Sequence, residues 1–84
     1  MSMALNLKPV YERLNKDRVI QLLRYILRVQ GVELRRLDYN KAAQALGVLR
    51  PQIARDCQKL REAQLIIVEG DKMRISPDVV ITKA

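Results

Sequence analysis

Apolar residues recur at the spacing of an amphipathic helix in the first half of the chain. From residue 19 onward they occupy positions i, i+1, i+4, i+7 and i+8, namely Val19, Ile20, Leu23, Ile26 and Leu27. We therefore predict a helix over residues 16–30. Asn15 can cap its start, because the side-chain oxygen accepts a hydrogen bond from a free backbone N–H, and Gly31 is suited to end it with a left-handed cap.

Two shorter helical patterns follow. Asp38 is a good cap for a helix over about residues 39–46, and Pro51 suits the first turn of a helix over about residues 50–63. In the second of these, an apolar stripe at i, i+4 and i+7 is predicted to face the core: Ile53, Cys57 and Leu60. Residues 32–37 alternate imperfectly and predict one short strand before these helices.

The period changes to that of β-strands after residue 64. Two short runs, residues 65–68 and 73–76, flank a turn centred on Gly70 and Asp71, because glycine accepts the positive φ of a tight hairpin. A two-residue loop would pair Val68 with Met73 and Ile66 with Ile75, so that one face of the hairpin is apolar.

The two ends of the chain have weaker patterns. Residues 1–14 predict a loose arm followed by a short helix, and residues 77–84 form a short tail with a β-branched run over 79–82. The predicted organisation is therefore an arm, one domain over residues 15–76, and a tail. The fold class is mainly α with a small β-hairpin (α+β).

Composition limits the chemistry that this domain can perform. Eighty-four residues form one small core, and the absence of His removes the commonest general base and metal ligand. The single Cys57 forms neither an internal disulfide nor a thiolate metal cluster. The longest apolar runs are too short to span a membrane. We expect no enzyme activity, no cofactor, no metal, no small-molecule ligand and no membrane, in a cytoplasmic protein.

The charge points to a polyanion as partner. Sixteen Lys and Arg residues against nine Asp and Glu residues leave a net charge of +7. Nucleic acid is the polyanion that this balance favours, and only three Tyr with no Phe or Trp argue against stacking on single strands.

Residues 39–53 carry a family resemblance. The segment resembles a helix-turn-helix signature, with a small residue early in the first helix, glycine in the turn and a branched apolar residue in the second helix, which are Ala43, Gly47 and Ile53. Together with the predicted hairpin, the chain resembles winged helix-turn-helix DNA-binding domains of bacterial, archaeal and viral regulators over residues 15–76, with a three-helix core plus a wing. Two positions depart from the pattern: Leu49 stands where a capping Ser or Thr is usual, and Gln64 stands where Gly often precedes the wing.

The resemblance implies roles for particular residues. The helix over about residues 50–63 would be the recognition helix in the major groove, where arginine can bind guanine and glutamine can bind adenine through two hydrogen bonds. The candidate base-reading residues are Arg50, Gln52 and Arg55. The candidate contacts to the DNA backbone, with the hairpin also able to enter the minor groove, are Lys41, Gln44, Lys59, Lys72 and Arg74.

The sequence thus predicts a small transcription regulator that binds double-stranded DNA and associates with the nucleoid. We expect a homodimer, because one domain of this size reads only a few base pairs. The two copies would be joined through the N-terminal arm and first helix, or through the tail of residues 79–82 pairing as an added strand. Two alternatives remain open at this point. One is a winged-helix module for protein interactions, and the other is the DNA-binding fragment of a replication or partition protein.

Overall fold

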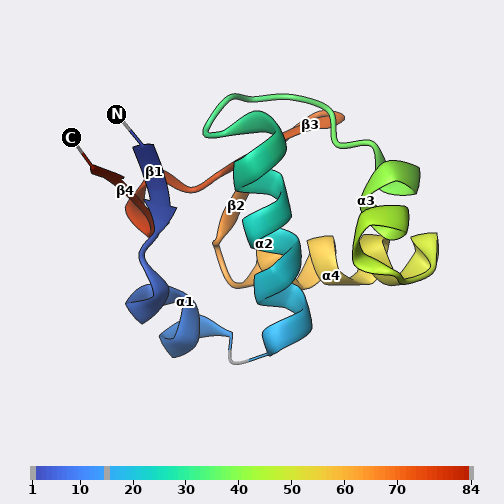
Figure 1. The fold of residues 1–84 in the computed structure, drawn as a ribbon, viewed down its shortest axis with the longest axis horizontal. Coiled ribbons are helices and arrows are strands. Elements are labelled where there is room, and N and C mark those ends of the chain that lie inside the picture. Colours follow the sequence, from blue (N-terminus) through green and yellow to red (C-terminus); the bar gives the residue numbers. More distant parts are fainter. Residues whose placement is uncertain (1, 15, 84) are drawn as a thin grey trace.

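The fold is described from a computed structural model covering the backbone of residues 2–14 and 16–83 and the side chains of residues 3–14 and 16–81. This part of the chain forms a small α+β fold, with helices and two separate two-stranded antiparallel sheets (Figure 1). In chain order the elements are β1 (Ser2–Leu5), α1 (Leu7–Arg13), α2 (Asp17–Gln30), α3 (Tyr39–Leu46), α4 (Arg50–Glu62), β2 (Ile66–Glu69), β3 (Lys72–Ile75), a 3-10 turn (Pro77–Val79) and β4 (Val80–Lys83).

Helix α2 lies in the middle of the molecule, with β1, β4 and both chain ends on one side and α3 on the other (Figure 1). Its apolar stripe is buried as predicted, with Leu27 half-buried, and Leu22 and Tyr25 extend it. The other helices and the hairpin complete one core with buried side chains including Val10, Ala42, Ile53, Leu60, Leu65, Met73, Ile75 and Val79. Because α2 packs against β1, α3, α4 and β3, it holds the small domain together.

The ends of α2 differ in detail from the prediction. The proposed cap, Asn15, lies outside the described residues, and Lys16 at the first boundary makes no side-chain capping bond. The helix ends at Gly31 as predicted, with φ 60°. Its ψ of −127° lies outside the left-handed helical region, so the cap is a positive-φ turn of another kind.

The strand predicted over residues 32–37 is reduced to a single bridge. Arg35 and Met73 exchange two backbone hydrogen bonds, at 3.0 and 2.9 Å, and the flanking residues run as a loop. The buried amide of Gln30 takes part in the same junction: its Nε2 donates to the carbonyl of Met73 at 2.9 Å and to that of Glu33 at 3.1 Å. The loop is therefore tied to β3 at one point, where α2 ends.

A turn of three residues joins α3 to α4. Asp38 caps α3 as predicted, its carboxylate accepting from the N–H of Lys41 at 3.1 Å. Gly47 ends α3 in the left-handed conformation, φ 67° and ψ 33°, which an L side chain adopts at a cost. Leu49 begins α4 without a side-chain capping bond, as the sequence implies, and Pro51 stands in the first turn. The two helices pack across this turn because Ala42 and Ala43 are small and buried.

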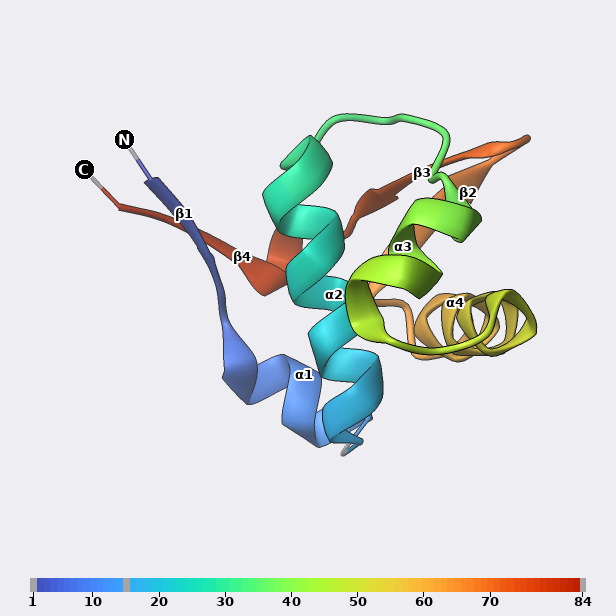
Figure 2. The same cartoon turned by 45° about the vertical axis from the view of Figure 1, so that its right-hand side comes forward.

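The hairpin has the predicted register. Val68 pairs with Met73 and Ile66 with Ile75, and Glu69 pairs with Lys72 beside the two-residue loop. Gly70 takes a φ of 63° at the first loop position, which is the conformation that favours glycine there. In Figure 2 the hairpin extends beyond α3, so its tip projects from the body of the domain.

The N-terminal segment and the C-terminal tail pair with each other. Met3 is opposite Thr82 and Leu5 is opposite Val80 in the β1–β4 sheet, and the N–H of Asn6 donates to the carbonyl of Val79 at 2.8 Å. The segment expected as a loose arm is therefore a strand, followed by the expected short helix α1. The tail adds its strand within the chain, next to α2.

Gln64 takes the left-handed conformation at the end of α4. Its φ is 60°, and the turn carries the hydrogen-bond pair of a Schellman cap: Leu65 N–H to Leu60 O at 2.9 Å and Gln64 N–H to Arg61 O at 3.0 Å. Winged helix-turn-helix sequences often have glycine at this position. An L side chain in this conformation lowers the stability of the fold by about 1 kcal/mol.

We expect Gln64→Gly to raise the free energy of unfolding by about 0.5–1 kcal/mol, because relief of this conformation exceeds the added freedom of the unfolded chain. Urea denaturation followed by circular dichroism measures the change. Gln64→Ala is the matched control, since it keeps the Cβ and should leave stability within about 0.5 kcal/mol. Equal stabilisation by both substitutions would contradict the conformational explanation.

Candidate nucleic-acid interface

Helix α4 has one face in the core and one in solvent. Its predicted apolar stripe, Ile53, Cys57 and Leu60, is buried. The outward side is formed by exposed residues along the length of the helix: Arg50, Pro51, Ala54, Arg55, Gln58, Arg61 and Glu62. Arg55 lies well within this exposed side, whereas Arg50 begins the helix at its edge toward α3. Two of the three candidate base-reading residues are therefore accessible.

Gln52, the third candidate, is half-buried and already engaged. Its Nε2 donates to Oδ1 of Asp56 at 2.9 Å, one turn further along α4. Asp56 is only 1% exposed, and its Oδ2 lies 3.3 Å from Nε of Arg18 in the first turn of α2. The sequence predicted Gln52 as a free base-reading side chain, but its amide nitrogen is turned toward the junction of α2 and α4.

Sequence reasoning did not identify Asp56. The i, i+4 spacing of Gln52 and Asp56 is a signal for a side-chain hydrogen bond on a helix. It does not show that the carboxylate is buried, because burial arises from α2 packing against α4. A buried carboxylate is stable only with partners, and here the partners are a guanidinium and an amide.

Two lysine side chains also lie beside the junction of α2 and α4. Lys59 is half-buried, and the Lys16 side chain beside it holds the pKa of Lys59 below its ordinary value through hydrogen bonding and charge repulsion. The structure thus adds Lys16 and Arg18, from the start of α2, to the basic residues of α4. Neither was a candidate in the sequence.

The remaining candidates lie on α3 and the hairpin. Lys41 and Gln44 are exposed on α3, and Lys72 is exposed beside the hairpin loop. Arg74 is half-buried and pairs across the hairpin with Ile67. In the part of the chain that the structure describes, ion pairs form at Arg13 with Asp78, at Arg18 with Asp56 and at Arg35 with Glu33. The candidate cations of α3, α4 and the hairpin belong to none of these pairs.

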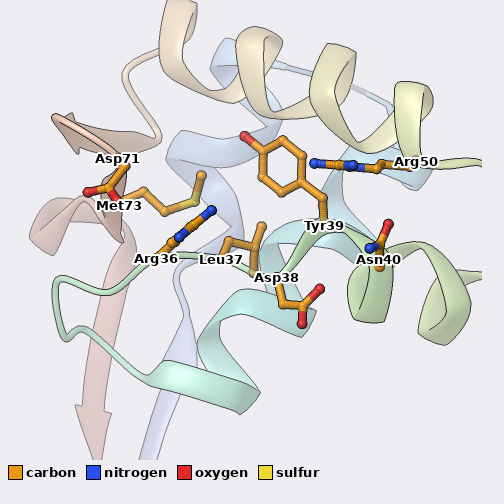
Figure 3. A pocket seen from close by; sticks show the side chains of 8 residues that line it. All are labelled: Arg36, Leu37, Asp38, Tyr39, Asn40, Arg50, Asp71 and Met73. Atoms are coloured by element: carbon orange, nitrogen blue, oxygen red, sulfur yellow. The ribbon is translucent and has the colours of Figure 1, made fainter.

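An open cavity of about 570 Å³ lies where α3, α4 and the hairpin meet. Figure 3 shows Tyr39 at its centre, with the Arg50 guanidinium pointing toward the ring from one side and Met73 on the other. Arg36 and Asp71 line the side near the hairpin. This cavity brings the first residue of α4 and the hairpin tip to the same region of the surface.

Cys57 on α4 and Tyr39 at the start of α3 share a side-chain hydrogen bond. Burial raises the pKa of the Cys57 thiol from 9.0 to about 11, although a hydrogen bond with Tyr39 acts in the opposite direction. Burial also raises the pKa of Tyr39. Both groups are therefore neutral at physiological pH, and the thiol behaves as a small buried apolar group, not as a reactive nucleophile.

We expect a loss of stability at high pH that depends on this thiol. The folded protein holds the Cys57 proton more tightly than the unfolded chain, so its contribution is complete below pH 9 and is lost as the pH rises toward 11. The loss is about 1 kcal/mol by pH 10. Urea denaturation measures the free energy of unfolding at pH 7.5 and at pH 10. Its decrease between these two pH values should be smaller by this amount in Cys57→Ala than in the unchanged protein. An identical drop in both proteins would contradict the assignment.

The Cys, Asp and Glu side chains of the described residues form no group of three or more that could hold a metal ion. No helix among them has the length and apolar character needed to cross a membrane. No protein-family model, curated protein or solved structure matches the chain.

Proposed function

We propose that the chain is a winged helix-turn-helix protein that binds double-stranded DNA with sequence preference and acts as a small transcription regulator. Helix α4 lies in the major groove, and the β2–β3 hairpin contacts the backbone or the adjacent minor groove. The observation that carries the proposal is the asymmetry of α4. One side is anchored by buried apolar residues, and the other presents arginines that have no carboxylate partner in the described part of the chain.

The connection between α3 and α4 supports this function. Helix-turn-helix units use a turn of three or four residues, often containing glycine, to set the second helix at a steep angle to the first. Here the turn is residues 47–49, with Gly47 in the left-handed conformation. Such an angle lets α4 enter a groove while α3 crosses the backbone.

The residues divide into two roles. Arg50 and Arg55 read bases, because a guanidinium can donate two hydrogen bonds to guanine, and Gln52 reads a base while it stays bonded to Asp56. Residues that contact phosphates supply affinity and register, and they are Lys41, Gln44, Lys59, Lys72 and Arg74. Regulation then depends on the concentration or self-association of the chain.

The test is a selection of bound sites from random duplex at two salt concentrations, followed by titration of selected and scrambled duplexes. The proposal predicts a defined motif and a selected site bound at least tenfold more tightly than the scrambled one. It also predicts that both affinities fall steeply as salt increases, because bound phosphates release counterions. Recovery of no motif, with equal affinity for all duplexes, would reject sequence-specific binding.

We also propose that the protein acts as a homodimer through its β1–β4 end. Exposed apolar side chains gather there: Met3 of β1 reaches Gly31 at the end of α2, near Val29 and Val32, and Ile81 of β4 is also exposed. A second copy offers the same surface and the same outer strand edges, which pair with no third strand among the described residues, and this is what a twofold interface requires. Two copies read two half-sites and so double the sequence recognised.

Analytical ultracentrifugation, with and without a selected duplex, tests the dimer. We expect a dimer on DNA that Ile81→Lys weakens without lowering the melting temperature, because Ile81 contributes exposed surface rather than core. A monomer in both conditions would reject the dimer.

A further inference from the structure

The buried carboxylate of Asp56 determines which way the Gln52 amide faces. A carboxylate has acceptor oxygens only, so the group that meets it at 2.9 Å must be the amide nitrogen Nε2. The other oxygen of Asp56 is engaged by Arg18, and the whole side chain is 1% exposed. The amide is therefore held in one of its two orientations.

This orientation leaves a defined pair of hydrogen-bonding groups on Gln52. One N–H of Nε2 is used by Asp56, so the second N–H and the oxygen Oε1 remain. No described group donates to Oε1, and no buried side-chain nitrogen or oxygen in the described residues lacks a partner. Oε1 is thus not sealed within the protein, and the Gln52 amide retains one donor and one acceptor.

We propose that Asp56 is a positioning residue that makes Gln52 select adenine, an inference that rests on the proposed function. Adenine shows an acceptor, N7, and a donor, N6, in the major groove, which match the free N–H and Oε1 of Gln52. Guanine shows two acceptors there, N7 and O6, so its O6 meets Oε1 with no proton between them. The fixed amide therefore favours adenine over guanine at one position of the site.

A second pair on the same helix supplies a matched control. Gln58 donates its Nε2 to Oε1 of Glu62 at 3.0 Å, again with a spacing of four residues. Both of these side chains are exposed, so water can replace the bond and Gln58 can turn over freely. Removing the charge at Glu62 repeats the chemical change made at Asp56 but fixes no orientation.

The experiment compares bound-site selections by the unchanged protein, Asp56→Asn and Glu62→Gln. The unchanged protein should prefer adenine over guanine about tenfold or more at one position. Asn at position 56 can also donate to Oε1 of Gln52, which frees the opposite amide orientation. We expect the adenine preference at that position to fall below threefold in Asp56→Asn, with guanine gaining, and to persist in Glu62→Gln.

Further measurements separate the effect on amide orientation from an effect on folding. Circular dichroism and affinity for random duplex should be nearly unchanged in Asp56→Asn, and Asp56→Ser, whose hydroxyl also donates and accepts, should give the same loss of preference. Arg18→Lys keeps the bond between Gln52 and Asp56 and should retain adenine. Gln52→Ala should remove the preference.

The outcomes distinguish this inference from the proposed function. If the unchanged protein selects a motif whose preferences are the same in Asp56→Asn, Asp56 does not position Gln52 for reading, while DNA binding stands. If Gln52→Ala lowers stability but changes no base preference, Gln52 serves only to satisfy the buried carboxylate, and the inference is again rejected. If the unchanged protein binds no duplex, both the function and the inference fail.

Discussion

Replacing Ile53 by alanine is expected to lower the free energy of unfolding by about 2–5 kcal/mol. Ile53 is 0% exposed in the first turns of α4, where it anchors the helix in the core shared with α2 and α3. The substitution removes buried apolar surface and leaves a cavity that a core of this size fills only in part. Urea denaturation followed by circular dichroism measures the loss.

Leu49→Ala is the matched control for that prediction. Leu49 is a large apolar residue four positions earlier, but it is 78% exposed and makes no capping bond. Its replacement should change stability by less than about 0.5 kcal/mol. Comparable losses in the two variants would show that Ile53 does not anchor α4 in the core. The outward face assigned to α4 would then be wrong.

Arg55→Ala is expected to weaken binding to a selected duplex by about 1–3 kcal/mol and to relax base preference at one position. Arg55 is exposed on the outward side of α4, and in the described part of the chain no carboxylate pairs with it. Fluorescence anisotropy with selected and scrambled duplexes measures both affinities. The loss should be larger on the selected duplex, because only there does the guanidinium meet its base.

Two other substitutions serve as comparisons for Arg55→Ala. Lys72→Ala, at the hairpin loop, should weaken all duplexes alike and reduce the slope of log K against log salt by about one, as expected for one phosphate contact. Lys8→Ala removes an exposed cation on α1, which lies apart from α4 in Figure 1, and should change little. Equal losses on selected and scrambled duplexes for Arg55→Ala would reject its role as a base reader.

Gln52 illustrates how far the site could be predicted from the sequence. Residue type and position in the expected recognition helix identified it as a candidate base reader. The sequence contains no sign that Asp56 is buried, since a carboxylate three residues after a buried isoleucine is as compatible with solvent as with the core. Arg18, which completes the network, is 38 positions away in the chain, and only the packing of α2 on α4 brings it to Asp56.

The strands show the same division between local and distant determinants. The register of the β2–β3 hairpin was predicted correctly, because only two residues separate the two strands and Gly70 adopts the positive φ that the turn needs. The segment over residues 32–37 was predicted as a strand from a weak alternation. It has only one bridging position, because Arg35 meets β3 at Met73 and the loop then leaves for α3.

By itself the sequence determined the local features of this protein: the apolar stripes of α2 and α4, the cap at Asp38, the turn at Gly47 and the hairpin. Each depends on residues within a few positions of one another, where backbone conformation and side-chain spacing are sufficient. The tertiary structure alone decided that β1 pairs with β4, that Asp56 is buried beside Arg18, and that Arg50 shares a cavity with the hairpin tip. These features join distant segments, and their partners are selected by the packing of the whole core.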